Sequence, residues 1–322
     1  MTAHAKRLVV IGDANPDLVL TGPELTPEFG QVEKLVERAD LVLGGSAAIT
    51  AAAAARLGTP TALVAAVGSD PMGDFVLTQV AAAGADVTSV VRSPGPTGVT
   101  VVLSRGDDRA ILTAPGVIDS LDAVQVSCSP ALDGAAHVHA SSFYLQPRLA
   151  ADLPALFTEV RERGATTSLD TNFDPAGRWL TRDLEALLRV CDLFFPNQTE
   201  AARLTGQDDP AVAARWLADR YGPRVAVKCG AAGALLHWDG QLVAVGPPAI
   251  AGADATGAGD AFDAGFLTAW LRTSDPDAAL RTAAAAGALA TTAVGAASRL
   301  DRAAVVTLSR TLITSRVDLS AG

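Results

Sequence analysis

One stretch of twelve residues combines small residues, a lone carboxylate and the start of a predicted helix. Residues 254–265 read DATGAGDAFDAG, and the segment AFDAGFLTAWL that begins at Ala261 has helical character. Glycine lets the backbone approach a ligand closely, and the unpaired N–H groups at a helix start favour anions. A phosphate cradle with Asp260 at its edge suits a reaction in which a hydroxyl loses its proton and attacks phosphate. The alternative is that Asp260 only caps the helix, because Asp is a preferred N-cap residue.

Polar residues also gather where other predicted strands end. They are Asp13, Asn15 and Asp17 after the strand at 8–12, Asp170, Thr171 and Asn172 after 166–170, Asn197 and Glu200 after 192–197, and Lys228 and Gly230 at the end of 225–230. Each group alone could be a turn or a helix cap. Their recurrence at one edge favours a site, because open α/β sheets bind ligands at the carboxyl ends of their strands.

The elements that must position these residues alternate between strand and helix. Further strands are predicted at 61–68 and 137–141, and further helices at 47–57, 74–83, 150–163, 181–190, 199–204 and 283–292. Such alternation indicates an α/β fold with a mostly parallel central sheet and helices on both faces. Residues 13–43 and 95–113 break the rhythm, and we expect them to form a small antiparallel flap over the strand ends. We find no repeat or linker, so residues 1–322 are expected to form a single domain.

Composition narrows the class of protein. Hydrophobic residues make up 49% of the chain and charged residues 19%, which predicts a large core rather than disorder. A net charge of −10 argues against nucleic acid and anionic membranes as partners. The three cysteines form no CxxC pair and are expected to be reduced thiols. The first apolar run is too short for a signal peptide, so we expect a soluble, cytoplasmic protein.

Five segments in this order resemble the ribokinase/PfkB family of carbohydrate and nucleoside kinases over nearly the whole chain. They are GDANPD at 12–17, GGSAAITAAAAARLG from Gly44, VGSDPMGDF at 67–75, PNQTEAARLTG at 196–206, and DATGAGD at 254–260, which is similar to the family's DTxGAGD signature. The resemblance implies a three-layer ribokinase-like fold with a small β-rich lid. It also implies an ATP-dependent enzyme that phosphorylates a hydroxyl of a sugar or sugar-like molecule.

The resemblance assigns roles to matching residues. Asp260 is expected to be the catalytic base, and the backbone N–H groups of Gly257, Ala258 and Gly259 the anion hole. The substrate is expected to be held by Asn15, Asp17, Gly44 and Gly45, with the two glycines also serving as a lid hinge. Asn197 and Glu200 are expected to order Mg²⁺ and its waters near ATP, while Asp254 and Thr256 lie where K⁺-binding members place ligands. Lys228 and Gly230 are candidate nucleotide contacts, although a lysine at a strand end is as often merely solvated.

Two departures from the family pattern concern the acceptor. Ile49 stands where the double-glycine signature usually has an Asn that contacts sugar hydroxyls, and isoleucine offers no hydrogen bond. Ile49 therefore either marks a less hydroxylated acceptor or packs in the helix core. Asp174 stands where many sugar kinases of the family carry Arg, which weakens the case for an acidic or phosphorylated sugar.

Several alternatives remain open from the sequence. A nucleoside kinase of the same fold would suit a less polar pocket near Ile49, and a catalytically silent ligand-binding homologue would keep the fold without turnover. A dinucleotide-dependent oxidoreductase is disfavoured, because the first strand lacks a GxGxxG turn. Exposed strand edges in the lid invite pairing between two copies of the chain, so a homodimer through the lid is expected.

Overall fold

The computed structural model describes residues 6–105, 108–250, 252 and 254–317. A ten-stranded sheet runs in the order β14–β13–β12–β11–β10–β9–β8–β1–β4–β5. Its strands are β1 (Arg7–Gly12), β4 (Thr61–Gly68), β5 (Val91–Ser93), β8 (Ala135–Ser141), β9 (Thr166–Asp170), β10 (Leu193–Phe194), β11 (Arg224–Lys228), β12 (Ala234–Trp238), β13 (Gln241–Val245) and β14 (Thr314–Val317). Pairing is parallel from β5 to β11, which confirms the expected sheet.

One edge of this sheet was not predicted. Strands β11 to β14 pair antiparallel to one another, so they form a meander added to the parallel part. These strands are only four or five residues long. Only β11 was expected, at 225–230. Strands β12 and β13 flank Asp239–Gly240, a pair typical of two-residue hairpin turns, so the sequence does carry a local signal for this hairpin.

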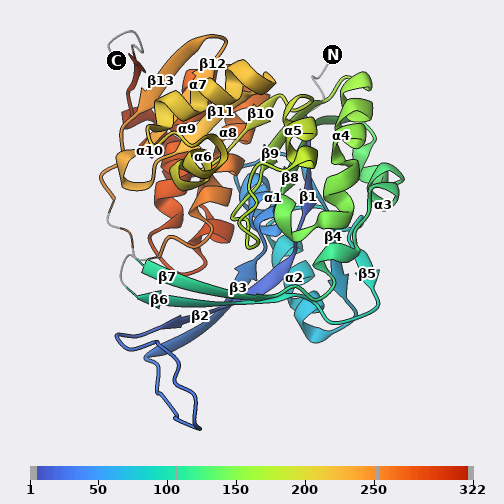
Figure 1. Cartoon of the computed structure of the whole chain (residues 1–322), viewed down its shortest axis with the longest axis vertical. Coiled ribbons are helices and arrows are strands. Elements are labelled where there is room, and N and C mark those ends of the chain that lie inside the picture. Colours follow the sequence, from blue (N-terminus) through green and yellow to red (C-terminus); the bar gives the residue numbers. More distant parts are fainter. Residues whose placement is uncertain (1–5, 106–107, 251, 253, 318–322) are drawn as a thin grey trace.

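Helices cover both faces of the large sheet and complete three layers (Figure 1). One face is packed by α1 (Ser46–Arg56), α2 (Pro71–Ala82), α8 (Ala258–Thr273), α9 (Pro276–Ala290) and α10 (Arg302–Thr311), and the other by α3 (Ala123–Ser127), α4 (Pro147–Glu162), α5 (Arg182–Leu188), α6 (Gln198–Thr205) and α7 (Pro210–Tyr221). Strand β1 shows why: Leu8 and Val10 pack into the first core, and Val9 and Ile11 into the second. A strand buried on both faces reads as one continuous apolar run.

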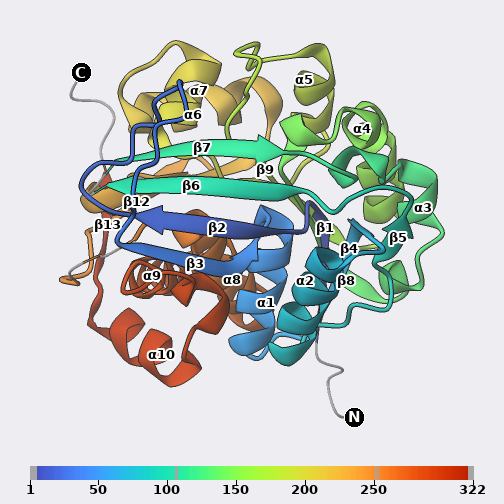
Figure 2. The ribbon, with the colours of Figure 1, turned by 90° about the horizontal axis from the view of Figure 1, so that it is seen from below.

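A second sheet of four strands forms the lid (Figure 2). Its strands, in spatial order, are β3 (Arg38–Gly44), β2 (Asn15–Thr21), β6 (Val99–Arg105) and β7 (Asp108–Ala114). They come from the two regions that interrupt the strand–helix rhythm. The two outer pairs are antiparallel as expected, while the central pair, β2 and β6, is parallel. The β2–β3 connection projects from the lid at the bottom of Figure 1.

No described helix is long and apolar enough to cross a membrane. The two sheets meet where β1 runs directly into β2 and where β3 runs directly into α1. The lid is therefore joined to the large sheet at the carboxyl end of β1, beside the polar residues singled out above.

Candidate active site

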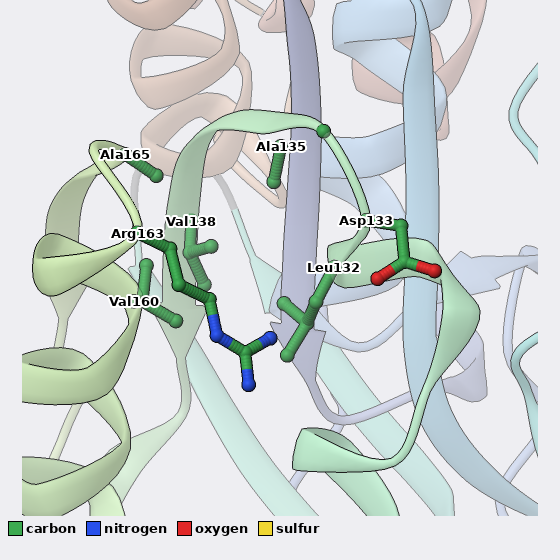
Figure 3. Close-up of a pocket in the computed structure, with 8 residues that line it drawn as sticks. Leu132, Asp133, Ala135, Val138, Val160, Arg163 and Ala165 are labelled. Atoms are coloured by element: carbon green, nitrogen blue, oxygen red, sulfur yellow. The ribbon is translucent and has the colours of Figure 1, made fainter.

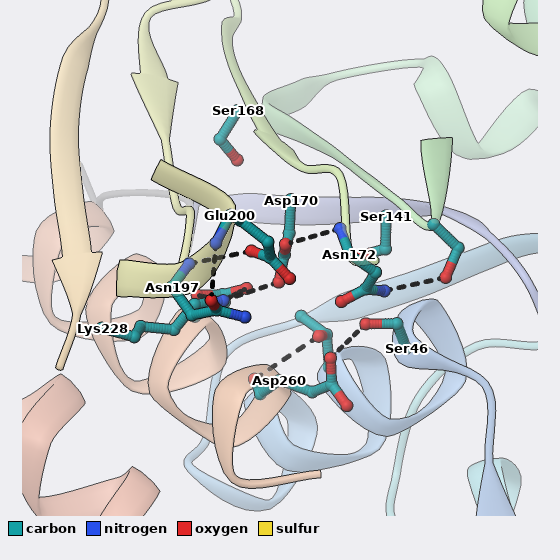
Figure 4. Close-up of polar contacts among 12 residues, drawn as sticks. Ser46, Ser141, Ser168, Asp170, Asn172, Asn197, Glu200, Lys228 and Asp260 are labelled. Atoms are coloured by element: carbon teal, nitrogen blue, oxygen red, sulfur yellow. Dashed lines mark hydrogen bonds and ion pairs between the residues drawn. The ribbon is translucent and has the colours of Figure 1, made fainter. Parts of the chain in front are cut away.

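The predicted site residues converge at the carboxyl ends of β1, β9 and β11, next to the first turns of α1, α6 and α8 (Figure 4). Glycine starts two of these helices. Gly45 precedes α1 with a φ of 77°, and Gly257 precedes α8 with a φ of 74°. These positive φ values are strained for residues with a side chain, so the two glycines permit the chain to turn abruptly into each helix.

Asp260 lies in the first turn of α8 and is buried, with 8% of its surface exposed. The N-cap position is Gly257, and no side chain caps this helix, so the capping interpretation of Asp260 is wrong. The carboxylate is directed at α1 instead, where its Oδ1 accepts a hydrogen bond from the Ser46 hydroxyl (Figure 4). Its Oδ2 accepts no hydrogen bond from any residue that the structure describes.

Burial raises the pKa of Asp260 to about 7. The Ser46 hydrogen bond works against this shift, the negative charges of Asp170 and Asp13 add to it, and the Lys228 ammonium opposes it. A carboxylate with a pKa near neutrality can hold a proton taken from a hydroxyl more readily than an ordinary aspartate can.

Asn15 and Asp17 form the lid side of the site. The Asn15 amide donates to Asp17 Oδ1 and to Thr100 Oγ1, each at 3.1 Å. Burial, followed by the charges of Asp13 and Asp260, raises the pKa of Asp17 to about 7. Asp17 also lies tightly against Gly44, because a β-carbon there would lie 1.9 Å from Asp17 Oδ1. Gly44 is thus required for this carboxylate to fit.

Asp13 fixes the start of α1 rather than pointing to a ligand. Its Oδ1 accepts from the Ala47 N–H at 3.1 Å, and its carbonyl oxygen accepts from the Ala48 N–H at 3.2 Å. Two of the otherwise unpaired N–H groups of the first turn are satisfied in this way.

Ile49 is 4% exposed and lies beside Gly257, which precedes α8. A β-carbon added to Gly257 would lie 3.3 Å from Ile49 Cδ1 and 3.4 Å from Ile49 Cγ2. Of the two interpretations of this residue, the packing one matches its contacts in the structure.

Asn197 and Glu200 form a reciprocal capping box at the start of α6. The Asn197 N–H donates to Glu200 Oε2 at 2.8 Å, and the Glu200 N–H donates to Asn197 Oδ1 at 2.9 Å. Burial, and then the charge of Asp170, raises the pKa of Glu200 to about 7. The NxxE pair is therefore a helix cap, and it also places a buried carboxylate beside the charged cluster of Figure 4.

Lys228 lies among carboxylates. Its ammonium is 2.7 Å from Asp170 Oδ2 and 3.3 Å from both carboxylate oxygens of Asp263. It also runs beneath the predicted anion hole, because a β-carbon on Gly259 would lie 3.4 Å from Lys228 Nζ. Burial lowers the pKa of Lys228, but the two aspartates outweigh it and leave this pKa raised.

Asp263 and Ser46 were missed by sequence reasoning. A signal for Asp263 exists, since it is a charged residue one turn after Asp260 in an otherwise apolar helix. Burial holds the pKa of Asp263 well above its ordinary value, and Lys228 opposes this shift. Ser46 carried no signal of its own, because serine at a helix start is ordinary.

The remaining predicted residues occupy two places. Asp254 Oδ1 accepts from the Thr256 N–H at 3.1 Å and from Thr256 Oγ1 at 2.8 Å, while Asp254 Oδ2 is buried without a partner. Gly230 follows β11 with a φ of 55° and is exposed, with open space where a β-carbon would be.

A small cavity of about 110 Å³ lies away from these residues, at the starts of β8 and β9 and the end of α4 (Figure 3).

The sequence profile of the pfkB family carbohydrate kinases matches residues 5–303. The chain belongs to this family. It is 34% identical over 295 residues to the ATP-dependent ribose-1-phosphate kinase of Halopiger xanaduensis, covering 91% of this chain and 94% of that protein. It is 29% identical over 304 residues to the ribokinase of Haemophilus influenzae, covering 92% and 95% of the two chains.

The fold agrees with this assignment. The ribokinase of Arabidopsis thaliana, solved in complex with ribose and ATP, matches with a TM-score of 0.80 and 26% identity, over 95% of this chain and 99% of that one. The protein is accordingly an ATP-dependent carbohydrate kinase with a ribokinase-like fold and a lid.

Proposed function

We propose that this kinase transfers the terminal phosphoryl group of ATP to a hydroxyl of a five-carbon sugar, with Asp260 as the catalytic base. The observation that carries the proposal is the setting of Asp260. It is a buried carboxylate at a helix start, with one oxygen held by Ser46 and the other without a partner among the described residues. Asp17, from the lid, lies close enough for the charge of Asp260 to contribute to the raised pKa of the Asp17 carboxyl.

The reaction follows from these positions. The acceptor hydroxyl gives its proton to Asp260, its oxygen attacks the terminal phosphorus of ATP, and the bond to the bridging oxygen breaks to release ADP. The N–H groups of Gly257, Ala258 and Gly259 would receive the negative charge of the phosphoryl group in transfer. Phosphoryl transfer depends mainly on such positioning and charge stabilisation.

A neutral sugar is the acceptor that the site favours. The residues assigned to the acceptor are one amide, Asn15, and two carboxyl groups, Asp17 and Asp260. All three can hydrogen-bond to sugar hydroxyls, and the carboxylates repel phosphate. Ile49 packs on Gly257, so its replacement of the usual Asn removes a contact without adding an apolar surface for a nucleoside base. A second candidate acceptor is ribose-1-phosphate, because a relative with 34% identity over most of both chains acts on it.

Two cations would complete the site. Asn197 and Glu200 offer the oxygen ligands that Mg²⁺ prefers. Burial raises the pKa of Glu200 and the charge of Asp170 adds to the shift, and a divalent ion would offset that charge. When bound, Mg²⁺ would neutralise phosphate charge. The buried, unpaired Oδ2 of Asp254 fits a monovalent cation, with Thr256 alongside, and K⁺ is the proposed occupant.

We also propose a cytoplasmic homodimer that pairs through the lids. Large apolar side chains are exposed on the two outer lid strands, with Leu41 at 42%, Ile111 at 54% and Leu112 at 60%. Light scattering should give twice the mass of one chain, and Leu112→Glu should reduce it to one.

An acceptor screen tests the function. ADP release should be measured with ATP and Mg²⁺ on ribose, deoxyribose, ribose-1-phosphate and several nucleosides. We expect the highest kcat/KM with a neutral pentose. Preference for ribose-1-phosphate would overturn the proposal of a neutral acceptor. Preference for a nucleoside would overturn the proposal of a sugar acceptor. No stimulation of ADP release by any acceptor would favour a catalytically silent binding protein.

A further inference from the structure

The first five residues of α1 meet the start of α8, with Asp260 in its first turn, at three points. Ser46 bonds the Asp260 carboxylate, Ile49 contacts Gly257, and Thr50 donates to the Asp260 carbonyl oxygen at 3.4 Å. These positions are spaced i, i+3 and i+4, so they share one face of the helix. Their exposures are 7%, 4% and 0%, which means that this face is packed against the start of α8.

We propose that Ser46 is a positioning residue for the catalytic base, holding Asp260 Oδ1 so that Oδ2 is presented to the acceptor hydroxyl. This inference rests on the proposed function, because it requires Asp260 to be the base. Ser46 directly follows Gly44 and Gly45, the expected hinge of the lid. Its hydrogen bond therefore connects the end of this hinge to the Asp260 carboxylate.

The Ser46 hydroxyl is not used by its own helix. Serine at a helix start ordinarily accepts a hydrogen bond from a nearby N–H. In α1 the N-cap is Gly45, no side chain at the cap bonds the helix, and Asp13 accepts from the Ala47 N–H instead. The partner of Ser46 is 214 positions away, on α8. Its contact with Asp260 is therefore a tertiary contact that a capping role does not explain.

The charges around Asp260 explain what the Ser46 hydroxyl contributes. Asp260 is surrounded by ionisable groups from every packed element, namely Asp13 after β1, Asp17 on β2, Asp170 on β9, Glu200 on α6, Lys228 on β11 and Asp263 on α8. All but Lys228 are carboxyl groups. The Ser46 hydrogen bond lowers the pKa of Asp260 against this surplus of negative charge. Without it, a larger fraction of the base would be protonated at neutral pH and unable to accept a proton.

The test removes the hydroxyl and measures the pH dependence of kcat. Ser46→Ala should lower kcat at pH 7 by about tenfold or more, and should move the acid limb of the kcat profile to higher pH. The KM for ATP should stay unchanged. Ser46→Thr, which keeps a hydroxyl, should restore most of the activity, while Ser46→Cys, of similar size but with a weak donor, should resemble Ser46→Ala.

Thr268→Ala is the matched control. Thr268 Oγ1 bonds Thr59 Oγ1 at 2.8 Å, a buried hydroxyl contact between α8 and the end of the α1 segment, far along both helices from Asp260. It should lower the thermal midpoint about as much as Ser46→Ala does, with no change in the pH profile.

Two results would overturn the inference. One is a Ser46→Ala enzyme that loses stability like Thr268→Ala but keeps the wild-type pH profile and kcat, since Ser46 would then be structural. The other is full activity in Ser46→Cys. The proposed function fails separately: substantial turnover in Asp260→Asn would remove the base itself, whatever the Ser46 variants do.

Discussion

The large sheet carries one buried polar cluster beside the carboxyl ends of its strands and a second between two of its strands, and the two differ in their charge. The first is the cluster around Asp260. The second, which we call the histidine ladder, lies between β8 and β9 and comprises Thr166, His137, Ser168, His139 and Ser141. Its successive contacts are 2.7, 2.7, 2.7 and 2.9 Å long.

The histidine ladder is neutral and fully paired. Burial lowers the pKa of His137 to about 3 and that of His139 to about 4, so both rings are uncharged at neutral pH. Each neutral ring has one donor and one acceptor nitrogen, and both find a hydroxyl. Within each ring, a donor at one nitrogen makes the other nitrogen an acceptor, so the two contacts of each histidine are coupled.

The cluster around Asp260 is charged and incompletely paired. Its carboxyl groups outnumber its one lysine. Burial raises the pKa values of Asp17 and Asp260 to about 7, and neighbouring carboxylates add to both shifts. Stable proteins rarely keep such groups without a use, since burying a charge is costly. The comparison teaches that buried polar groups do not by themselves mark a functional site. Buried carboxyl groups without enough partners to neutralise them do mark one.

Asp260→Asn should have the largest effect of any variant, because it tests whether the charged cluster carries out catalysis. Removing the proposed base should lower kcat by about a thousandfold or more, while binding of ATP persists. Steady-state turnover and ATP titration measure the two effects. Asp133→Asn is the matched control, because Asp133 is exposed beside the cavity at the opposite edge of the sheet (Figure 3). Equal loss in both variants would contradict a specific role for Asp260.

Lys228→Met should have the largest effect on stability. It leaves Asp170 as a buried, unpaired charge, and breaking a buried pair typically costs about 3–5 kcal/mol in the free energy of unfolding. Denaturant titration measures the cost. Arg224→Met, on the same strand, removes an exposed contact to Asp239 and the stacking of the guanidinium on Trp238, and should cost about 1–2 kcal/mol. If Lys228→Met costs no more stability than the control, the charge of Lys228 is not needed to stabilise the buried carboxylates.

The sequence predicts the part of the site that is local. Helix starts, glycine turns and the ends of parallel strands depend on a few neighbouring residues, so Asn15, Gly44, Asn197 and Asp260 could be placed on one edge. The family resemblance then supplied their expected chemistry.

The rest depends on contacts between distant segments. Ser46 meets Asp260 across 214 positions, and Lys228 meets Asp263 across 35. Nothing near these residues in the chain specifies such a partner. Ile49 shows the same limit, because only the packed structure reveals that it lies against Gly257. The antiparallel edge is a different case, because the Asp239–Gly240 pair between β12 and β13 is a local hairpin signal.

Ser168→Ala tests whether the histidine ladder contributes to stability but not to catalysis. It leaves His137 Nε2 and His139 Nδ1 without their shared partner. A buried polar group without a partner costs about 1–3 kcal/mol of stability. The free energy of unfolding should fall by that amount, while kcat and its pH profile stay unchanged. Ser127→Ala, at an exposed hydroxyl, is the control and should do neither. A shifted pH profile in Ser168→Ala would mean that the ladder belongs to the catalytic machinery.

The smallest expected effect is a difference in how stability responds to acid. The ladder histidines have folded pKa values below the unfolded value of 6.5, so the unfolded chain binds more protons and stability falls as the pH drops below about 6.5. Asp17 has a folded pKa of about 7, above its unfolded value of 3.8, so it adds stability as the pH drops through 7. The two clusters therefore oppose each other in the wild type.

Single variants separate the two contributions. Between pH 7.5 and 6, Asp17→Asn should lose about 1 kcal/mol more stability than the wild type, because the gain from protonating Asp17 is gone. His137→Gln should lose roughly 1 kcal/mol less than the wild type over the same interval. Denaturant titrations at the two pH values measure both. Responses of the same sign in the two variants would mean that the charged cluster and the neutral ladder do not differ in protonation as the comparison requires.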